Sequence, residues 1–272
     1  MTVSSSTQRH PTLAALGRGD PDFATDCDWL TAQLTALYLH DERGRITSRC
    51  DAGRTPAPRF HLGRTRHGVL WRLRRDLPAP LAARLSRLAA RDHTPTGDTL
   101  LWPSPERNED LRRALDGAEP VVSVFRGLVF RLPEDAESLA VLEARGRGAE
   151  PLDPASPEVR EALCGLLPAV FPDAAEVSAR APLVASRDEQ GQLAAVCCVS
   201  SGDPARAVEA GVETLPTLRR LGHGSRAVAA WLAAVRRLGG TPLYATSSEN
   251  RASLGLARSL GLEAFADIVH WS

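Results

Sequence analysis

Two glutamates, Glu209 and Glu213, lie in an apolar stretch that ends shortly before a glycine-bearing loop. The alternation of small or apolar residues over 205–215 predicts a strand, and residues four apart in a strand share one face. A carboxylate in a half-buried cleft has its pKa raised by desolvation, and such a group can take a proton from an amine. Either glutamate is therefore a candidate general base. Glu213 is preferred over Glu209, although a bulge in the strand would reverse the facing.

The loop at 219–224 reads Arg-Arg-Leu-Gly-His-Gly, and a predicted helix follows at 225–238. The first N–H groups of a helix have no partner within it, and together with the helix dipole they favour a bound phosphate. Gly222 and Gly224 permit unusual backbone angles and close approach of a ligand. Two such glycines also occur in plain loop-to-helix turns, so the segments that follow carry the argument.

A second unit of the same kind comes next in the chain. The run 241–247 predicts a strand, and Asn250 to Ser253 then open a short helix. Gly261 suits the position just beyond the end of that helix, where a left-handed backbone is common. The chain therefore repeats the order of strand, loop and helix twice before its last run.

Two strand–loop–helix units in this order resemble the GNAT superfamily of acyl-CoA N-acyltransferases. The Arg-x-x-Gly-x-Gly sequence at 219–224 matches the pyrophosphate loop of that family, and Asn-x-x-Ser at 250–253 matches its second block. The resemblance covers residues 139–272 and is closest to a group of bacterial two-domain members with a C-terminal GNAT domain. It implies transfer of an acyl group, most often acetyl, from acetyl-CoA to the primary amine of an acceptor.

The resemblance also implies which residues hold the donor. Backbone N–H groups of 221–225 would bind the pyrophosphate, and the strand end at 213–215 would follow the pantetheine arm. Arg219 and Arg220 would either add charge near the phosphates or be solvated, His223 is expected to be exposed, and one second-block residue could be a plain helix cap. The expected donor contacts are Glu213, Thr214, Leu215, Arg219, Arg220, Leu221, Gly222, His223, Gly224, Ser225, Asn250 and Ser253.

One position departs from the family pattern. Many members carry a tyrosine seven positions after the motif asparagine, where it protonates the leaving thiolate, and here that position is Ala257. Another acid or water is then needed, or the activity is weak. Tyr244 is expected to be packed, and Ser247 and His270 are distant alternatives, the latter a surface residue by its place near the C-terminus. The departure supports a second hypothesis, a CoA-binding or regulatory module that has lost efficient catalysis.

A Rossmann-type nucleotide binder ranks third among the possible functions, because the glycine-bearing loop lies too near the C-terminus.

Composition bounds the remaining classes. The 272 residues carry 33 basic and 33 acidic side chains, and every basic one is an arginine, so no net charge points to nucleic acid. Five cysteines without metal-ligand spacing and no long apolar run indicate a reduced, cytoplasmic protein without a metal or a membrane segment. A homodimer is compatible with these features. Arginines gather at 59–91, where a solvated hairpin is preferred to a site for an anionic partner.

The order of predicted elements indicates an α/β (α+β) fold. We expect an N-terminal α+β domain at 1–135, which shapes the acceptor site or is a degenerate GNAT-like half. We expect a C-terminal GNAT domain at 136–272, with a mixed β-sheet flanked by helices. Predicted helices are 29–38, 80–90, 111–115 and 157–167. Predicted strands or hairpins are 59–73, 121–132 with a break near Gly127, 139–144 and 182–200. A loop is predicted at 93–107.

Overall fold

The structure is a computed structural model that describes residues 24–50, 56–92, 105–202 and 207–272. In chain order the elements are α1 (Asp26–Leu37), β1 (Tyr38–His40), β2 (Ile46–Arg49), β3 (Phe60–Thr65), β4 (Gly68–Leu73), α2 (Ala79–Ala89), α3 (Pro105–Asp116), β5 (Val124–Arg131), α4 (Ala136–Gly146), β6 (Ala149–Leu152), α5 (Pro157–Leu166), α6 (Ala174–Ala179), β7 (Leu183–Arg187), β8 (Leu193–Gly202), β9 (Ala207–Thr214), α7 (His223–Arg237), β10 (Thr241–Ser247), α8 (Arg251–Ser259) and β11 (Glu263–Trp271). A short 3₁₀ helix, Pro216–Leu218, lies between β9 and α7.

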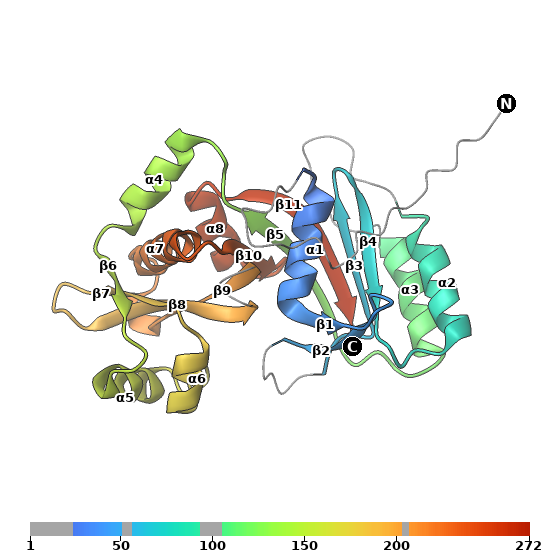
Figure 1. Ribbon diagram of the computed structural model, residues 1–272, viewed down its shortest axis with the longest axis horizontal. Coiled ribbons are helices and arrows are strands. Elements are labelled where there is room, and N and C mark those ends of the chain that lie inside the picture. Colours follow the sequence, from blue (N-terminus) through green and yellow to red (C-terminus); the bar gives the residue numbers. More distant parts are fainter. Residues whose placement is uncertain (1–23, 51–55, 93–104, 203–206) are drawn as a thin grey trace.

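The described residues form a mixed sheet of nine strands in the order β4-β3-β11-β5-β10-β9-β8-β7-β6 and a separate two-stranded sheet of β1 and β2 (Figure 1). β9 and β10 are parallel, and the other neighbouring strands are antiparallel. β5 lies between β10 and β11, so one strand from the N-terminal part of the chain is built into the C-terminal part of the sheet. The predicted α/β class with a mixed sheet flanked by helices is confirmed, whereas the division at 135/136 stays a prediction.

Helices cover both faces of this sheet (Figure 1). α4, α7 and α8 pack on one face of β7 to β10, and their contact forms the largest apolar core. On the opposite face, α5 and α6 cover β7 and β8, while α1 covers the central strands. α2 and α3 pack against β3 and β11. The face of β9 that points away from α7 is therefore flanked by α1 on one side and by α5 and α6 on the other.

Most of the predicted elements are present, and one is of the wrong type. The segment predicted as a strand at 139–144 lies inside α4. Asp135 accepts a hydrogen bond from the backbone N–H of Ser138 and so caps this helix at its start. Leu142 is buried against α7. The helices predicted at 29–38, 80–90 and 157–167 and the hairpins at 59–73 and 182–200 are confirmed within one to three residues at their ends.

Two further segments differ from expectation in length. The helix predicted at 111–115 begins at Pro105, because proline suits the first turn of a helix. Part of the loop predicted at 93–107 lies outside the described residues. β5 continues through Gly127, where a Cβ would collide with the carbonyl oxygen of Thr246 on β10. Glycine at 127 therefore permits the close approach of two strands and does not interrupt either of them.

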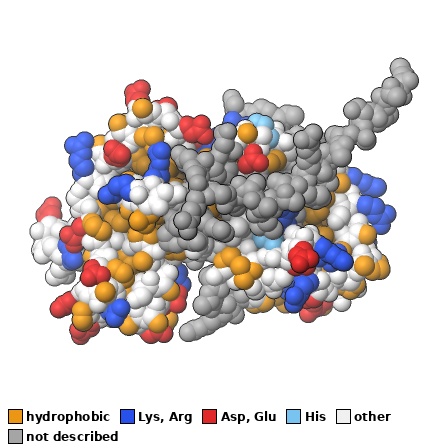
Figure 2. Space-filling model, viewed as in Figure 1, with side chains coloured by type: hydrophobic (Ala, Val, Ile, Leu, Met, Phe, Trp, Pro, Cys, Tyr) orange, Lys and Arg blue, Asp and Glu red, His pale blue; other side chains and the backbone are white. Residues whose placement is uncertain are grey.

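The arginines of the N-terminal hairpin are used partly inside the protein. Arg59 is buried and donates to the backbone oxygens of Leu115 and Glu119 at 3.1 and 2.6 Å. Arg64 forms a buried two-pronged pair with Asp267, with N···O distances of 2.9 and 2.7 Å. The prediction of a solvated hairpin is wrong for these two side chains, because α2 and α3 cover that side of β3. On the visible surface, acidic and basic side chains are interspersed (Figure 2).

The cysteines behave as apolar side chains. All five are thiols, and Cys197 and Cys198 point to opposite faces of β8, as strand alternation predicts. Burial raises the pKa of both thiols, so neither is a ready nucleophile. In the described part of the chain, the helices are too short or too polar to cross a bilayer.

Candidate active site

β9 and β10 run side by side only over their first residues. Their parallel pairing ends where Glu209 faces Leu243. Beyond that point β10 continues against β5 as far as Ser247, and β9 continues against β8 as far as Thr214. The carboxyl-terminal halves of β9 and β10 are therefore no longer hydrogen-bonded to each other and separate. One edge of β9 then carries backbone N–H and C=O groups that β10 does not pair.

The first turn of α7 lies at the carboxyl-terminal end of β9 and has open N–H groups. Gly222 is the N-cap of this helix with a φ of +87°, and no side chain caps the turn. Arg220, two residues earlier, also has a positive φ of 67°. A Cβ at Gly224 would come within 2.9 Å of the hydroxyl oxygen of Thr214, so glycine lets the helix approach the strand. Uncapped N–H groups beside left-handed loop residues form the kind of site that binds phosphate.

The other side chains of the loop are mostly exposed. Leu221 is 62% exposed, and Arg219 and Arg220 are exposed as well. Arg219 Nε donates to the backbone oxygen of Thr214 at 3.3 Å, which ties the loop to the end of β9. Thr214 and Leu215 are half-buried at that strand end. Both arginines can therefore meet an anion from solvent, as the resemblance implies, or remain solvated.

His223 is buried, which contradicts the expectation that it is exposed. Its Nδ1 lies 2.9 Å from the hydroxyl of Ser186 on β7, and Arg226 donates to the same hydroxyl at 3.1 Å. His223 stands four residues before Ala227 and eight before Trp231, both fully buried, so it belongs to the face of α7 that packs on the sheet. That four-residue spacing is the sequence signal that identifies the buried position.

The second motif opens α8. The side-chain oxygen of Asn250 accepts a hydrogen bond from the N–H of Ser253 at 3.0 Å, so the capping role weighed for this motif is present. Ser225 on α7 and Ser259 on α8 have hydroxyl oxygens 3.4 Å apart. The two helices that follow the parting strands therefore lie against each other. Gly261 ends α8 with a φ of +69°, as its position predicts.

Glu209 and Glu213 share the face of β9 that points away from α7, because their even-numbered neighbours lie in the core under α7. Glu209 is 8% exposed, and Nε2 of Gln33 on α1 donates to its Oε1 at 2.7 Å. Glu213 is exposed. The irregularity in pairing lies in β8, between Val199 and Ser201, and so does not reverse the facing of β9. The contact from Gln33 has no signal in the sequence, since 176 positions separate the two residues.

A pocket of about 180 Å³ borders Glu213 on this face. Within it, Arg180 pairs with Glu176 at 2.7 Å and donates to the backbone oxygen of Val199 at 3.3 Å. Burial raises the pKa of the Cys198 thiol to about 12, so this thiol stays protonated. The lining combines apolar side chains with one carboxylate and one guanidinium: Val170, Phe171, Arg180, Val196, Cys198, Ser200, Gly211, Val212 and Glu213.

Of the side chains considered as acids, Tyr244 and His270 are packed against other groups, and Ser247 is half-buried with its hydroxyl accepting a hydrogen bond from the N–H of Glu249. Ala257, at the position where many family members carry tyrosine, is fully buried on the side of α8 that packs into the core. Tyr244 is 3% exposed, and burial raises the pKa of its hydroxyl. His270 is half-buried and stacks on Phe125 with ring centroids 4.9 Å apart, so it is not the exposed surface residue that its place in the chain predicts. In the described ranges, no three His, Cys, Asp or Glu side chains are grouped as metal ligands would be.

The segment that contains both loops and both glutamates matches a known family. Residues 152–262 match the model of the acetyltransferase (GNAT) family. No curated protein matches the sequence significantly.

Solved structures that are similar to this chain include the following three. A GNAT-family chain from Novosphingobium aromaticivorans DSM 12444 is 22% identical with a TM-score of 0.41, over 56% of this chain and 65% of that one. A GCN5-related N-acetyltransferase-like protein from Streptococcus suis 89/1591 is 15% identical with a TM-score of 0.47, over 94% and 96%. An aminoglycoside 6′-N-acetyltransferase complexed with coenzyme A is 16% identical with a TM-score of 0.35, over 46% and 95%. From the family match at 152–262, the C-terminal part of this chain carries a domain of the GNAT acetyltransferase family.

Proposed function

We propose that this protein transfers an acetyl group from acetyl-CoA to a primary amine of an acceptor molecule. The observation that carries the proposal is the parting of β9 and β10 beside the uncapped first turn of α7. The pyrophosphate of the donor would meet the N–H groups of 221–225, with Arg219 and Arg220 adding charge. The donor arm would follow 213–215 between the strands and meet Asn250 and Ser253 at the start of α8.

The acceptor would approach on the face that points away from α7. The pocket beside Glu213 lies there, and its exposed carboxylate would attract the ammonium form of an amine. The burial of Glu209 supports this residue as the general base, because a desolvated carboxylate takes a proton more readily than a solvated one. It would act directly or through a water molecule. This assignment reverses the order of preference that the sequence favours.

Bond formation then needs a polarised thioester and an outlet for two protons. The amine nitrogen attacks the carbonyl carbon of the thioester, and the carbon–sulfur bond breaks. Backbone N–H groups on the unpaired edge of β9 beyond Glu209 would stabilise the negative charge on the carbonyl oxygen. The ammonium form of the acceptor loses one proton to the glutamate before the attack, and the nitrogen loses its second proton to water as the new carbon–nitrogen bond forms. The departing thiolate takes its proton from a group other than residue 257, because Ala257 has no ionisable side chain.

Ligand-induced thermal stabilisation tests the donor site. Acetyl-CoA at about one hundred times its Kd should stabilise the folded protein by about 2.7 kcal/mol, which raises the melting temperature by several degrees, whereas NAD should not. Gly222→Asp should abolish the shift by placing a carboxylate where the phosphates bind. Gly222→Asn, the neutral isostere that tolerates the same backbone, should keep much of it.

The other end of α7 supplies a matched control. Gly239 also has a positive φ, +77°, and at both glycines the described residues leave open space for 4 Å around the place that a Cβ would take. Gly239→Asp therefore introduces the same strain and the same charge away from the proposed phosphate site. Equal loss of the acetyl-CoA shift in Gly222→Asp and Gly239→Asp would contradict the loop assignment. Absence of any shift with acetyl-CoA or CoA in well-folded wild-type protein would contradict the donor itself.

The two glutamates are separated by steady-state kinetics with an amine found in an acceptor screen. Glu209→Gln should lower kcat by about 10²- to 10⁴-fold with little change in acetyl-CoA affinity, as expected for loss of a general base. Glu213→Gln should mainly raise the KM for the amine. The opposite pattern would return the base role to Glu213. Full activity in both variants would exclude a base on β9.

A second candidate function rests on one observation. Ala257 is fully buried in the core, so no acid stands at the position that the family uses for one. The alternative is a CoA-binding or regulatory module with weak or lost catalysis. It predicts a thermal shift with acetyl-CoA but no release of free CoA thiol with any amine. The homodimer and the cytoplasmic location stay predictions, and the five thiols fit a reducing compartment.

A further inference from the structure

We infer that Gln33, a residue of the N-terminal part of the chain, is a positioning residue for the carboxylate of Glu209. The inference rests on the proposed function, in which Glu209 is the base. Gln33 Nε2 donates to Glu209 Oε1 at 2.7 Å. Gln33 is 0% exposed and Glu209 is 8% exposed. The contact joins α1 to β9 at the point where β9 and β10 begin to part.

The chemistry of this contact fixes its direction. A carboxylate accepts hydrogen bonds and a primary amide both donates and accepts, so only Nε2 can face an ionised Glu209. A hydrogen bond to an ionised group in a buried place stabilises the charged form and restricts its rotation. Gln33 Oε1 is buried without a partner among the described residues, which costs free energy. The Nε2 group of Gln33 therefore makes the stabilising contact of this side chain, and its Oε1 makes none among the described residues.

The carboxyl-terminal end of α1 is fastened to the strands that carry the site. The Ser201 hydroxyl on β8 donates to the backbone oxygen of Ala36 at 3.0 Å, and both groups are buried. The next residue of β8, Gly202, packs closely on the same end of α1, because a Cβ on this glycine would come within 2.9 Å of the Ala36 Cβ. Ser201 faces Glu209 in the pairing of β8 with β9. This end of the helix therefore cannot drift away from the glutamate without breaking buried contacts.

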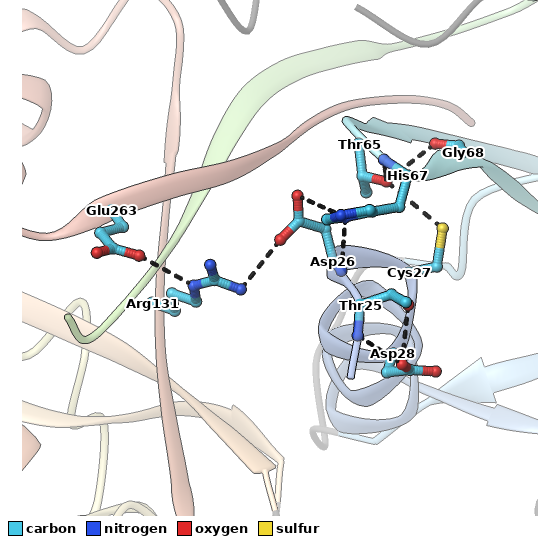
Figure 3. A network of polar contacts seen from close by, with 9 residues as sticks. All are labelled: Thr25, Asp26, Cys27, Asp28, Thr65, His67, Gly68, Arg131 and Glu263. Carbon is cyan, nitrogen blue, oxygen red and sulfur yellow. Dashed lines mark hydrogen bonds and ion pairs between the residues drawn. The ribbon is translucent and has the colours of Figure 1, made fainter. Parts of the chain in front are cut away.

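The start of α1 is fastened to the far half of the sheet (Figure 3). Asp26 accepts a hydrogen bond from Arg131 Nη1 at 3.0 Å, and Arg131 Nε donates to Glu263 at 3.2 Å. One turn further on, Leu30 packs directly on the backbone of β3 at Gly63, where a Cβ would lie 2.6 Å from a Leu30 methyl carbon. With both ends fixed, the helix sets the position of the amide between them.

The consequence is that the proposed base is held by a residue outside the matched family segment. Residues 152–262 contain Glu209, whereas α1 lies more than one hundred positions upstream. The N-terminal part of the chain would then complete the catalytic face in addition to covering it. Removing the donor of Gln33 should leave the glutamate in place but less readily ionised and less well oriented.

The test compares Gln33→Met with the wild-type full chain. Methionine keeps the unbranched shape of glutamine, removes the donor, and also removes the unpartnered Oε1, so folding should be retained. Thr31→Val is the matched control on the same helix, because its hydroxyl donates to the backbone oxygen of Cys27 at 2.8 Å and not to Glu209. Each protein is labelled with ¹³C at the glutamate carboxyl carbons. The Glu209 signal is identified by its absence in Glu209→Gln.

We expect the Glu209 carbon to titrate about one pH unit higher in Gln33→Met than in wild type or Thr31→Val. With an accepted amine, the acidic limb of kcat/KM should move by the same amount, while the KM for acetyl-CoA stays the same. An unchanged Glu209 titration in folded Gln33→Met overturns the inference. If that variant does not fold, Gln33→Asn keeps an amide one methylene too short and is judged by the same criterion.

The titration needs no substrate, so the two proposals fail separately. A shifted Glu209 titration without acetyl transfer to any amine would contradict the proposed function, but it would still support the role of Gln33 in positioning the Glu209 carboxylate. Acetyl transfer with an unchanged titration would contradict the role of Gln33 and leave the proposed function in place.

Discussion

Acidification should destabilise this protein through histidines whose rings are packed inside the fold, and the half-buried His270 is the residue best suited to a test. Its ring is stacked against Phe125 and His61, with centroids 4.9 and 5.7 Å away. Burial, assisted by the positive charge of Arg49, lowers the pKa of His270 from 6.5 to about 4. At neutral pH the folded protein therefore holds a neutral imidazole in a half-buried ring stack.

The sign of the effect follows from that order of pKa values. Because the folded pKa lies below the unfolded one, the unfolded chain binds the proton first as the pH falls. The stability contributed by the neutral ring is complete above pH 6.5 and is lost progressively between pH 6.5 and about 4. For one histidine with these values, the free energy of unfolding falls by about 2 kcal/mol between about pH 7 and about pH 5.

His270→Phe isolates this contribution, because phenylalanine keeps a flat ring in the stack but cannot bind a proton. Urea denaturation of both proteins at neutral and acidic pH gives the free energy of unfolding in each case. The loss on acidification should be about 2 kcal/mol smaller in the variant than in wild type. His40 and His61, whose pKa values burial also lowers, remain in both proteins and largely cancel in this difference. Equal losses in the two proteins would refute the reasoning.

Three further substitutions test the packing that supports the site. Gly224→Val should weaken acetyl-CoA binding about tenfold or more in calorimetry, because a Cβ at this position would already lie 2.9 Å from the hydroxyl oxygen of Thr214 on β9. An unchanged Kd would contradict the close approach of α7 to β9. Gly63→Ala should cost about 1–3 kcal/mol in urea denaturation, because its Cβ would overlap Leu30; a neutral result would mean that α1 can shift. Arg64→Leu should cost about 3–5 kcal/mol by leaving the Asp267 carboxylate buried without its two-pronged partner, and Arg64→Leu combined with Asp267→Leu should recover part of it.

Local sequence signals were sufficient for the strand–loop–helix units. The fixed backbone needs of Gly222 and Gly261, the capping side chain of Asn250 and the alternation around Glu209 act over a few residues, so they can be read without the fold. The same holds for the common face of the two glutamates, since alternation is a property of the strand itself. These signals also carry the resemblance to the GNAT family, which the match at 152–262 bears out.

Local signals failed where a distant partner decides the environment. His223 is expected to be exposed although its spacing to Ala227 and Trp231 indicates a buried position, and its partner there, Ser186 on β7, lies 37 positions away and is given only by the fold. Arg64 looks like part of a solvated basic hairpin, yet it meets Asp267, 203 positions away. The helix at 136–146 was predicted in part as a strand because short apolar runs have no decisive period.

The sequence by itself determined most of the elements and the family of the C-terminal part, because each depends on residues close together in the chain, and it predicted that the loop at 219–224 binds phosphate. Only the tertiary structure decided which glutamate is desolvated. Glu209 and Glu213 are equivalent by alternation, and they differ because α1 covers one and a pocket borders the other. That difference arises from packing between segments 176 positions apart, and no pattern within either segment contains it.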